Sequence, residues 1–120
     1  MQGMSKMHKP EAVFRIRGNK IFWGPGLMEL LEKVDETGSV KAASKEMYIS
    51  YAKARRLIAL AESELGYRLT EPSRGGASRG GTVLTEEGKE YLKNCSLIQK
   101  EVQDHCEELY RRYFQSSENI

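Results

Sequence analysis

The most chemically distinctive side chains of this protein are basic, and they gather in the middle of the chain. Between Gly38 and Leu60 there is a single acidic residue, Glu46, against five basic ones: Lys41, Lys45, Lys53, Arg55 and Arg56. Such side chains bind phosphate oxygens, and an arginine can also donate two hydrogen bonds to one guanine. Basic residues on a helix also serve simply to solvate it. The choice between these two interpretations depends on the secondary-structure elements that position the basic residues.

Two helices joined by a tight turn carry these residues. Ser39 and Ser50 are suitable N-caps, and they predict helices over residues 40–47 and 51–65. Gly66 then suits the left-handed end of the second helix. In that helix the apolar residues recur on one face: Ala54, Leu57, Ile58, Ala61 and Leu65. The opposite face, near the helix start, is therefore exposed and carries the arginines.

The flanking segments complete a small domain around this pair. Residues 14–23 alternate in polarity about a Gly-Asn step, which predicts a hairpin. A helix over residues 25–37 follows, and Gly38 suits its left-handed end. Its apolar residues form one stripe: Leu27, Leu30, Leu31 and Val34. After the basic helix, strands over residues 68–70 and 82–84 are joined by the loop EPSRGGASRGG, whose glycines and arginines predict an exposed basic tip. Two strands joined in this way after a helix-turn-helix form a wing.

A long final helix is predicted over residues 85–114, with Thr85 as its cap. At 1.5 Å per residue it is about 45 Å long. Such a helix is too long for one small core to cover, so we expect part of its apolar stripe to form a homodimer interface. The residues expected in this interface are Tyr91, Cys95, Ile98, Val102, Leu109 and Tyr113.

The fold class that follows is mainly α with a small β wing (α+β), a winged helix-turn-helix with a long C-terminal dimerisation helix. Residues 1–12 are expected to be a flexible leader and residues 13–120 a single domain, with the helix-turn-helix at about 39–65 and the wing at about 67–84. The chain has 30% charged and 39% hydrophobic residues and a net charge of +2. It has no apolar run of the ~20 residues needed to cross a bilayer. We therefore expect a cytoplasmic protein without a membrane partner.

The sequence offers no convincing catalytic or metal-binding constellation. His105, Cys106 and Cys95 do not match a zinc-ligand spacing, and cysteines within an apolar stripe are more often buried and inert. The glycine pairs of the wing lack the strand-before, helix-after context of a nucleotide-binding loop. We expect neither enzymatic activity nor a cofactor.

A helix-turn-helix places its second helix in the DNA major groove while the preceding helix contacts the backbone. Tyr51, Lys53, Arg55 and Arg56 are therefore the groove candidates. Ser39 and Lys41 are better placed for phosphates, and the wing arginines for flanking phosphates or the minor groove. The full set expected at double-stranded DNA is Ser39, Lys41, Ser50, Tyr51, Lys53, Arg55, Arg56, Arg74 and Arg79.

These motifs together carry a family resemblance. The segments GSVKAASKEMYIS, YAKARRLI, ESELGYRL and TVLTEEG resemble the winged helix-turn-helix of LysR-type transcriptional regulators and of ModE, the molybdate-responsive regulator. Tyr51 after Ser50 and the doubled glycines of the wing look more like ModE. The resemblance covers about residues 14–92. It implies a sequence-specific transcriptional regulator that binds palindromic DNA as a dimer.

The sequence also departs from the family pattern. The oxyanion-binding domains that follow this module in ModE have no counterpart before Ile120, so no small-molecule effector is expected. Leu69-Thr70-Glu71-Pro72 replaces the usual Phe-x-Arg at the end of the first wing strand, which leaves Arg74 as the nearest substitute for a phosphate contact. The alternative is a winged-helix module that binds another protein and not DNA. A basic first turn in the helix after Ser50 favours DNA.

Overall fold

The computed structural model describes residues 8–73 and 81–115. Its first elements are a hairpin, β1 (Ile16–Arg17) and β2 (Ile21–Trp23), and the helix α1 (Pro25–Thr37). The helix-turn-helix follows as α2 (Val40–Glu46) and α3 (Tyr51–Leu65), and the wing as β3 (Thr70–Pro72) and β4 (Thr82–Leu84). The described residues end with the long helix α4 (Glu86–Tyr110) and a π-helical turn (Arg111–Gln115). The winged helix-turn-helix predicted from the sequence is confirmed.

The core lies between α1, α2, α3 and the first turns of α4. All four residues of the predicted α1 stripe are buried: Leu27, Leu30, Leu31 and Val34. Trp23 closes the core from the hairpin side, and its ring lies edge-on to that of Tyr91 on α4, with centroids 5.3 Å apart. From α3 the core takes Ala54, Ile58 and Ala61, and the two alanines are small enough to let neighbouring helices pack closely.

The helix boundaries follow the capping residues expected from the sequence. The hydroxyl of Ser39 accepts the amide of Ala42, and that of Ser50 accepts the amide of Lys53, each at 3.0 Å. Gly38 ends α1 in the left-handed region, with φ 74°, and Gly66 ends α3 there with φ 82°. These local signals fix the helix-turn-helix.

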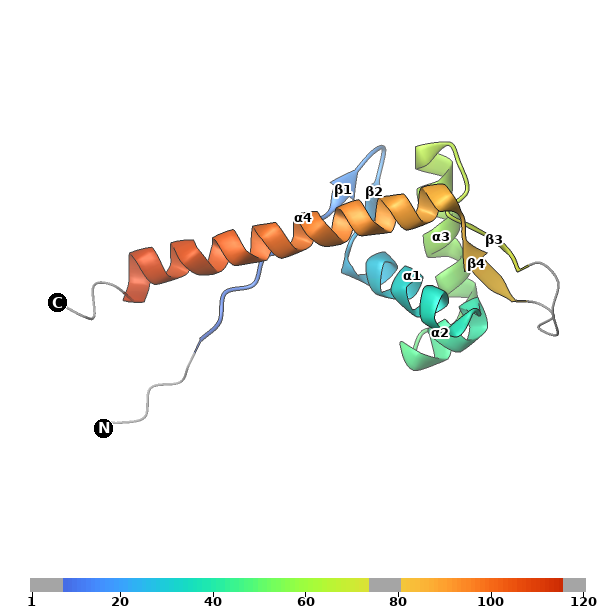
Figure 1. Ribbon diagram of the computed structural model, residues 1–120, viewed down its shortest axis with the longest axis horizontal. Helices are drawn as coiled ribbons and strands as arrows, with labels where there is room; N and C mark the ends of the chain where they lie inside the picture. Colours follow the sequence, from blue (N-terminus) through green and yellow to red (C-terminus); the bar gives the residue numbers. More distant parts are fainter. Residues whose placement is uncertain (1–7, 74–80, 116–120) are drawn as a thin grey trace.

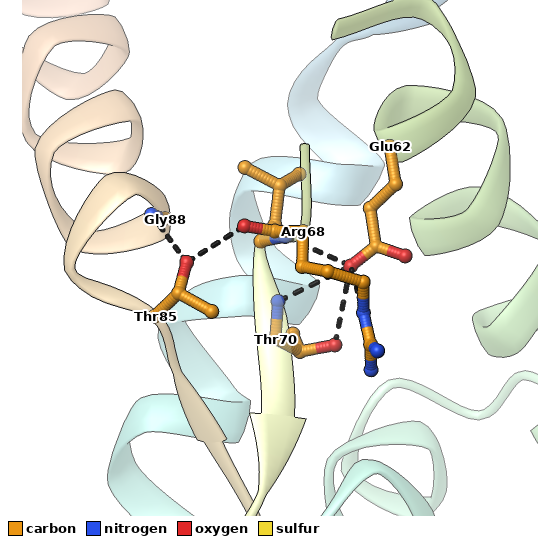
Figure 2. Close-up of polar contacts among 6 residues, drawn as sticks. Glu62, Arg68, Thr70, Thr85 and Gly88 are labelled. Atoms are coloured by element: carbon orange, nitrogen blue, oxygen red, sulfur yellow. Dashed lines mark hydrogen bonds and ion pairs between the residues drawn. The ribbon is translucent and has the colours of Figure 1, made fainter. Parts of the chain in front are cut away.

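The wing begins two residues later than predicted, because its first residues bind elsewhere. The amides of Leu69 and Thr70 donate to Glu62 Oε2 of α3, at 2.8 and 3.2 Å (Figure 2). The hydroxyl of Thr85 donates to the Arg68 carbonyl at 2.7 Å and accepts the amide of Gly88 at 2.8 Å. The antiparallel ladder then pairs Thr70–Pro72 with Thr82–Leu84.

The group Glu62, Leu69, Thr70, Thr85 and Gly88 is called the wing junction below. It connects the end of α3 to the base of the wing and to the start of α4. Gly88 is a glycine for a steric reason, since a Cβ at this position would overlap the carbonyl oxygen of Leu69.

The helix α4 projects away from the domain (Figure 1). Its first three turns pack on the core, and Cys95 is the last of its residues to be buried. Beyond this point the extended residues 8–14 run beside α4 (Figure 1). Residues 8–12 were expected to belong to a flexible leader, and here the backbone of Pro10 and Ala12 is hydrogen-bonded to the helix. Residues 1–7 of that leader lie outside the described residues.

Candidate nucleic-acid interface

Side chains from the starts of α2 and α3 come together on one face of the domain. Ser39 and Lys41 from α2, Tyr51 from α3 and Thr82 from β4 line a shallow hollow of about 340 Å³. The amide of Thr82 donates to the carbonyl of Gly38 at 2.8 Å, and this bond holds the wing base against the start of α2. Two of the elements predicted at DNA thus share one surface with the base of the wing.

The predicted groove residues lie on the exposed side of α3. Tyr51, Lys53, Arg55 and Arg56 are all exposed, whereas Ala54 and Ile58 face the core. We call Ser39, Lys41, Tyr51, Lys53, Arg55 and Arg56 the basic surface. Ser50 lies at its edge, where its hydroxyl oxygen caps α3.

The cations of the basic surface have no acidic partner in the described part of the chain. Elsewhere, lysines pair with carboxylates: Lys33 with Glu46 at 3.3 Å and Lys100 with Asp104 at 2.8 Å. Neither Lys41 nor any cation in the first half of α3 makes such a pair with the residues that the structure describes. Exposed, unpaired cations keep their full charge available to phosphates.

Two residues near this surface were not singled out from the sequence as candidate site residues. Thr82 was expected only as a strand residue, and no local signal places its side chain beside Lys41. Ala52 is exposed between Tyr51 and Lys53, and its small size leaves α3 open to close approach by a partner. The arginines Arg74 and Arg79 of the wing tip lie outside the described residues.

The predicted dimer residues divide into two groups along α4. Cys95 is only 3% exposed and Tyr91 packs on Trp23, so both are already used within the chain. Burial raises the pKa of the Cys95 thiol to about 11, which keeps it in the unreactive protonated form. The outer residues are available to a partner: Ile98 is 42% exposed, Val102 40% and Tyr113 69%, and Leu109 is half-buried.

Comparison with known proteins identifies the family of this chain. The model of the bacterial regulatory helix-turn-helix proteins of the lysR family matches residues 26–89, more than half of the chain. The chain belongs to the LysR family. The matched region contains α1, the helix-turn-helix, the wing and the start of α4.

The curated relatives that match are bacterial regulators. The chain is 35% identical over 83 residues to the HTH-type transcriptional activator AaeR of Escherichia coli K12, and equally to quorum-sensing regulator A of Escherichia coli O157:H7. Each match covers 69% of this chain and 25% of the relative. The chain therefore spans about a quarter of the length of the curated relatives it matches.

Solved structures of LysR regulators share the fold. The DNA-binding domain of CbnR in its complex with DNA matches with a TM-score of 0.55 and 25% identity, over 67% of this chain and 86% of that one. Full-length CbnR, a LysR family transcriptional regulator, matches with a TM-score of 0.58 and 23% identity, over 72% of this chain and 28% of that one. The finer resemblance to ModE stays a prediction, because the family model and full-length CbnR are of the LysR family.

Two other features, a metal site and a membrane-spanning helix, are not found among the described residues. In the described ranges no cluster of three or more His, Cys, Asp or Glu residues is placed to hold a metal ion. Within the same ranges, no helix is both long and apolar enough to span a bilayer.

Proposed function

We propose that this chain is the DNA-binding unit of a LysR-type transcriptional regulator, acting in the cytoplasm as a homodimer on two half-sites of a palindrome. α3 enters the major groove, the start of α2 and the wing contact phosphates, and the outer part of α4 pairs the two copies. The observation that carries this proposal is the basic surface: Lys41 and Tyr51 line the hollow, and the exposed cations of α3, unpaired within the described chain, follow Tyr51 along the helix.

The roles within the surface follow from reach and chemistry. Arg55 and Arg56 are long enough to donate two hydrogen bonds to a guanine in the major groove. Ala52 between them and the helix start suits contact with a thymine methyl group. Lys41 contributes charge beside the backbone, which adds affinity and salt dependence without base preference. A protein-interaction module has no comparable use for these unpaired cations.

Pairing through α4 begins beyond Cys95. The exposed Ile98, Val102 and Tyr113 and the half-buried Leu109 form an apolar stripe, and two copies of it would remove each other's apolar surface from water. Size-exclusion chromatography with light scattering tests this directly. Ile98→Asp with Val102→Asp should give a folded monomer, and a dimer of unchanged stability would place the interface elsewhere.

Fluorescence anisotropy tests the DNA assignment. The full chain is titrated with random duplexes and with palindromes selected from a random pool, over a series of salt concentrations. We expect log affinity to fall linearly with log salt, by about 0.9 for each phosphate contacted. Absence of binding to any duplex at low salt, by a folded dimer, would exclude the proposal in favour of the protein-interaction module.

Single substitutions assign the groove helix. Arg55→Ala and Arg56→Ala should each weaken binding to the selected duplex by about 1–3 kcal/mol and leave the circular dichroism spectrum unchanged. The matched control is Arg17→Ala, which removes an exposed arginine from the hairpin, at the end of α3 that lies away from α2 (Figure 1). Equal losses in all three variants would indicate nonspecific charge attraction and contradict a role for α3 in base recognition.

The finer, ModE-like prediction concerns Tyr51, which is 51% exposed at the start of α3. Tyr51→Phe removes only the hydroxyl. If this hydroxyl recognises a base, selection from a random pool should return a site with relaxed preference at one position in each half. An unchanged selected site would remove Tyr51 from the set of base-contacting residues.

A further inference from the structure

Two glutamines of α4 hold the extended segment before the hairpin. Gln103 accepts the amide of Ala12 at 2.9 Å and donates to the Pro10 carbonyl at 2.9 Å. Gln99 accepts the amide of Phe14 and donates to the Ala12 carbonyl, both at 2.8 Å. Each side-chain amide thus pairs with the backbone as a neighbouring strand would. We call residues 8–14 the strap.

The spacing of the glutamines matches the spacing of the strap. Side chains four residues apart on a helix lie on one face and about 6 Å apart along its axis. Alternate residues of an extended chain are about 6.6 Å apart. Gln99 and Gln103 can therefore bind successive alternate positions of the strap with no distortion of either element. An ion pair between Lys9 and Glu107, at 3.9 Å and with the lysine largely exposed, adds little to this.

The strap attaches at a point where α4 has left the core. Cys95 is the last buried residue of the helix, and Gln99 lies one turn beyond it. At its other end the strap continues into β1, whose partner strand β2 contributes the buried Trp23. The outer part of α4 is thus attached to the domain at a second place, through the hairpin. Two attachments fix the direction of the helix relative to the domain, whereas a single attachment would let the helix swing.

We propose that the strap is a brace, held by Gln99 and Gln103 as positioning residues, which fixes the direction of α4 relative to the helix-turn-helix. This proposal rests on the dimer of the proposed function, because α4 then sets the distance between two copies of α3 and hence the half-site spacing that the protein selects. Both the strap and the two glutamines lie outside residues 26–89, so the family match does not account for them.

The first test measures the brace itself, by NMR on the full chain. Gln99→Met with Gln103→Met keeps side-chain length and helix propensity but removes the amide groups. Hydrogen exchange at the amides of Ala12 and Phe14 should become at least about tenfold faster. Backbone order parameters of α4 beyond Cys95 should fall from about 0.85 towards 0.6. Lys93→Met, an exposed change on α4, is the control and should alter neither.

The second test measures the consequence at DNA. Affinities are compared for duplexes with one half-site and for palindromes whose centres differ by single base pairs. The double variant should bind one half-site as the native chain does, and should lose most of its preference for one spacing. Unchanged exchange at Ala12 and Phe14 would overturn the brace, and so would faster exchange with unchanged α4 order and spacing preference. If the native chain binds no duplex, the proposed function fails, and the NMR measurements alone decide whether the brace exists.

Discussion

The two halves of α3 are built in opposite ways. In the first half Tyr51, Lys53, Arg55 and Arg56 are exposed and contact no acidic group of the described chain. In the second half Glu62 is held by two backbone amides, a hydroxyl and the guanidinium of Arg68, and its side chain is 18% exposed (Figure 2). One end of the helix is left free for a partner, and the other is bound to the wing.

This difference separates stability from binding along one helix. Substitutions in the wing junction either remove contacts that the folded state needs or add atoms that it cannot accommodate, so they should lower the free energy of unfolding. Ser39 of the basic surface also caps α2, but the other side chains of this surface make no hydrogen bond or ion pair with the described chain, so their substitution should change affinity alone. The substitutions below test each side of this separation, beginning with the largest expected effect.

Gly88→Ala should have the largest effect on stability. The added methyl group would meet the backbone carbonyl of Leu69, which cannot move without displacing the wing strand. Overpacking against backbone should lower the free energy of unfolding by about 3 kcal/mol, more than the gain in helix propensity. Urea denaturation followed by circular dichroism measures the change.

Gly26→Ala is the matched control for that substitution. Gly26 is also a helical glycine, in the first turn of α1, but a Cβ there has open space around it. It should leave the stability unchanged or raise it by up to about 1 kcal/mol. If both glycine substitutions had the same small effect, close packing at the wing junction would not be what requires Gly88.

Glu62→Ala tests the polar side of the wing junction. It leaves the amides of Leu69 and Thr70 without their acceptor, and both residues are buried. The free energy of unfolding should fall by about 2 kcal/mol. Glu62→Gln keeps one acceptor oxygen and should lower it by only about 1 kcal/mol. An equal loss in both variants would assign the effect to the charge and its ion pair with Arg68.

The contrast within α3 also explains which parts of the structure could be predicted from the sequence. The helix-turn-helix depends on signals within a few residues of each boundary: Ser39 and Ser50 as caps, and Gly38 and Gly66 as ends. Caps and left-handed glycines act locally, so their residue types are sufficient. The apolar stripe of α1 was predicted for the same reason, because helical spacing alone decides which face is buried.

The strap depends on residues far apart in the sequence, and the wing junction on residues that belong to different elements. Gln103 and Pro10 are 93 residues apart, and Glu62 binds the amides of Leu69 and Thr70 across a turn. A glutamine or glutamate on a helix has the same local signature whether it binds backbone or water. For this reason residues 8–12 were assigned to a flexible leader, and β3 was expected two residues too early.

Alkaline pH tests the packing of α4 on the core, with a smaller expected loss of stability than the substitutions in the wing junction. Burial, with Cys95 and Tyr67 nearby, raises the pKa of Tyr91 from 10.0 to about 12. A raised pKa means that the neutral phenol is favoured in the folded state, so this stabilisation is present below pH 10 and is lost as the pH rises from 10 to 12. Cys95 adds a similar loss between pH 9.0 and about 11.

Tyr91→Phe isolates the contribution of the phenol. It keeps the ring that packs on Trp23 and removes the ionisable hydroxyl, so stability should fall less steeply above pH 10 than in the native chain. Urea titrations at several pH values between 9 and 12 measure the slope. Tyr113→Phe, at a ring that is 69% exposed, is the control and should leave the native slope unchanged. Identical slopes in all three proteins would show that the packing of α4 on the core does not raise the pKa of the Tyr91 hydroxyl.

The smallest effect on the free energy of unfolding is expected at the turn of the helix-turn-helix. Substitutions there also test whether this turn contributes to stability or to DNA binding. Tyr48 has a positive φ of 58° and is 96% exposed, so its backbone is strained with no packing in return. Tyr48→Asn places a residue that tolerates this conformation there, and should raise the free energy of unfolding by about 0.5–1 kcal/mol. Tyr48→Phe keeps the strain and should change nothing. If Tyr48→Asn weakens binding to the selected duplex, Tyr48 contacts DNA together with the basic surface. A residue that only forms the turn would not change the affinity.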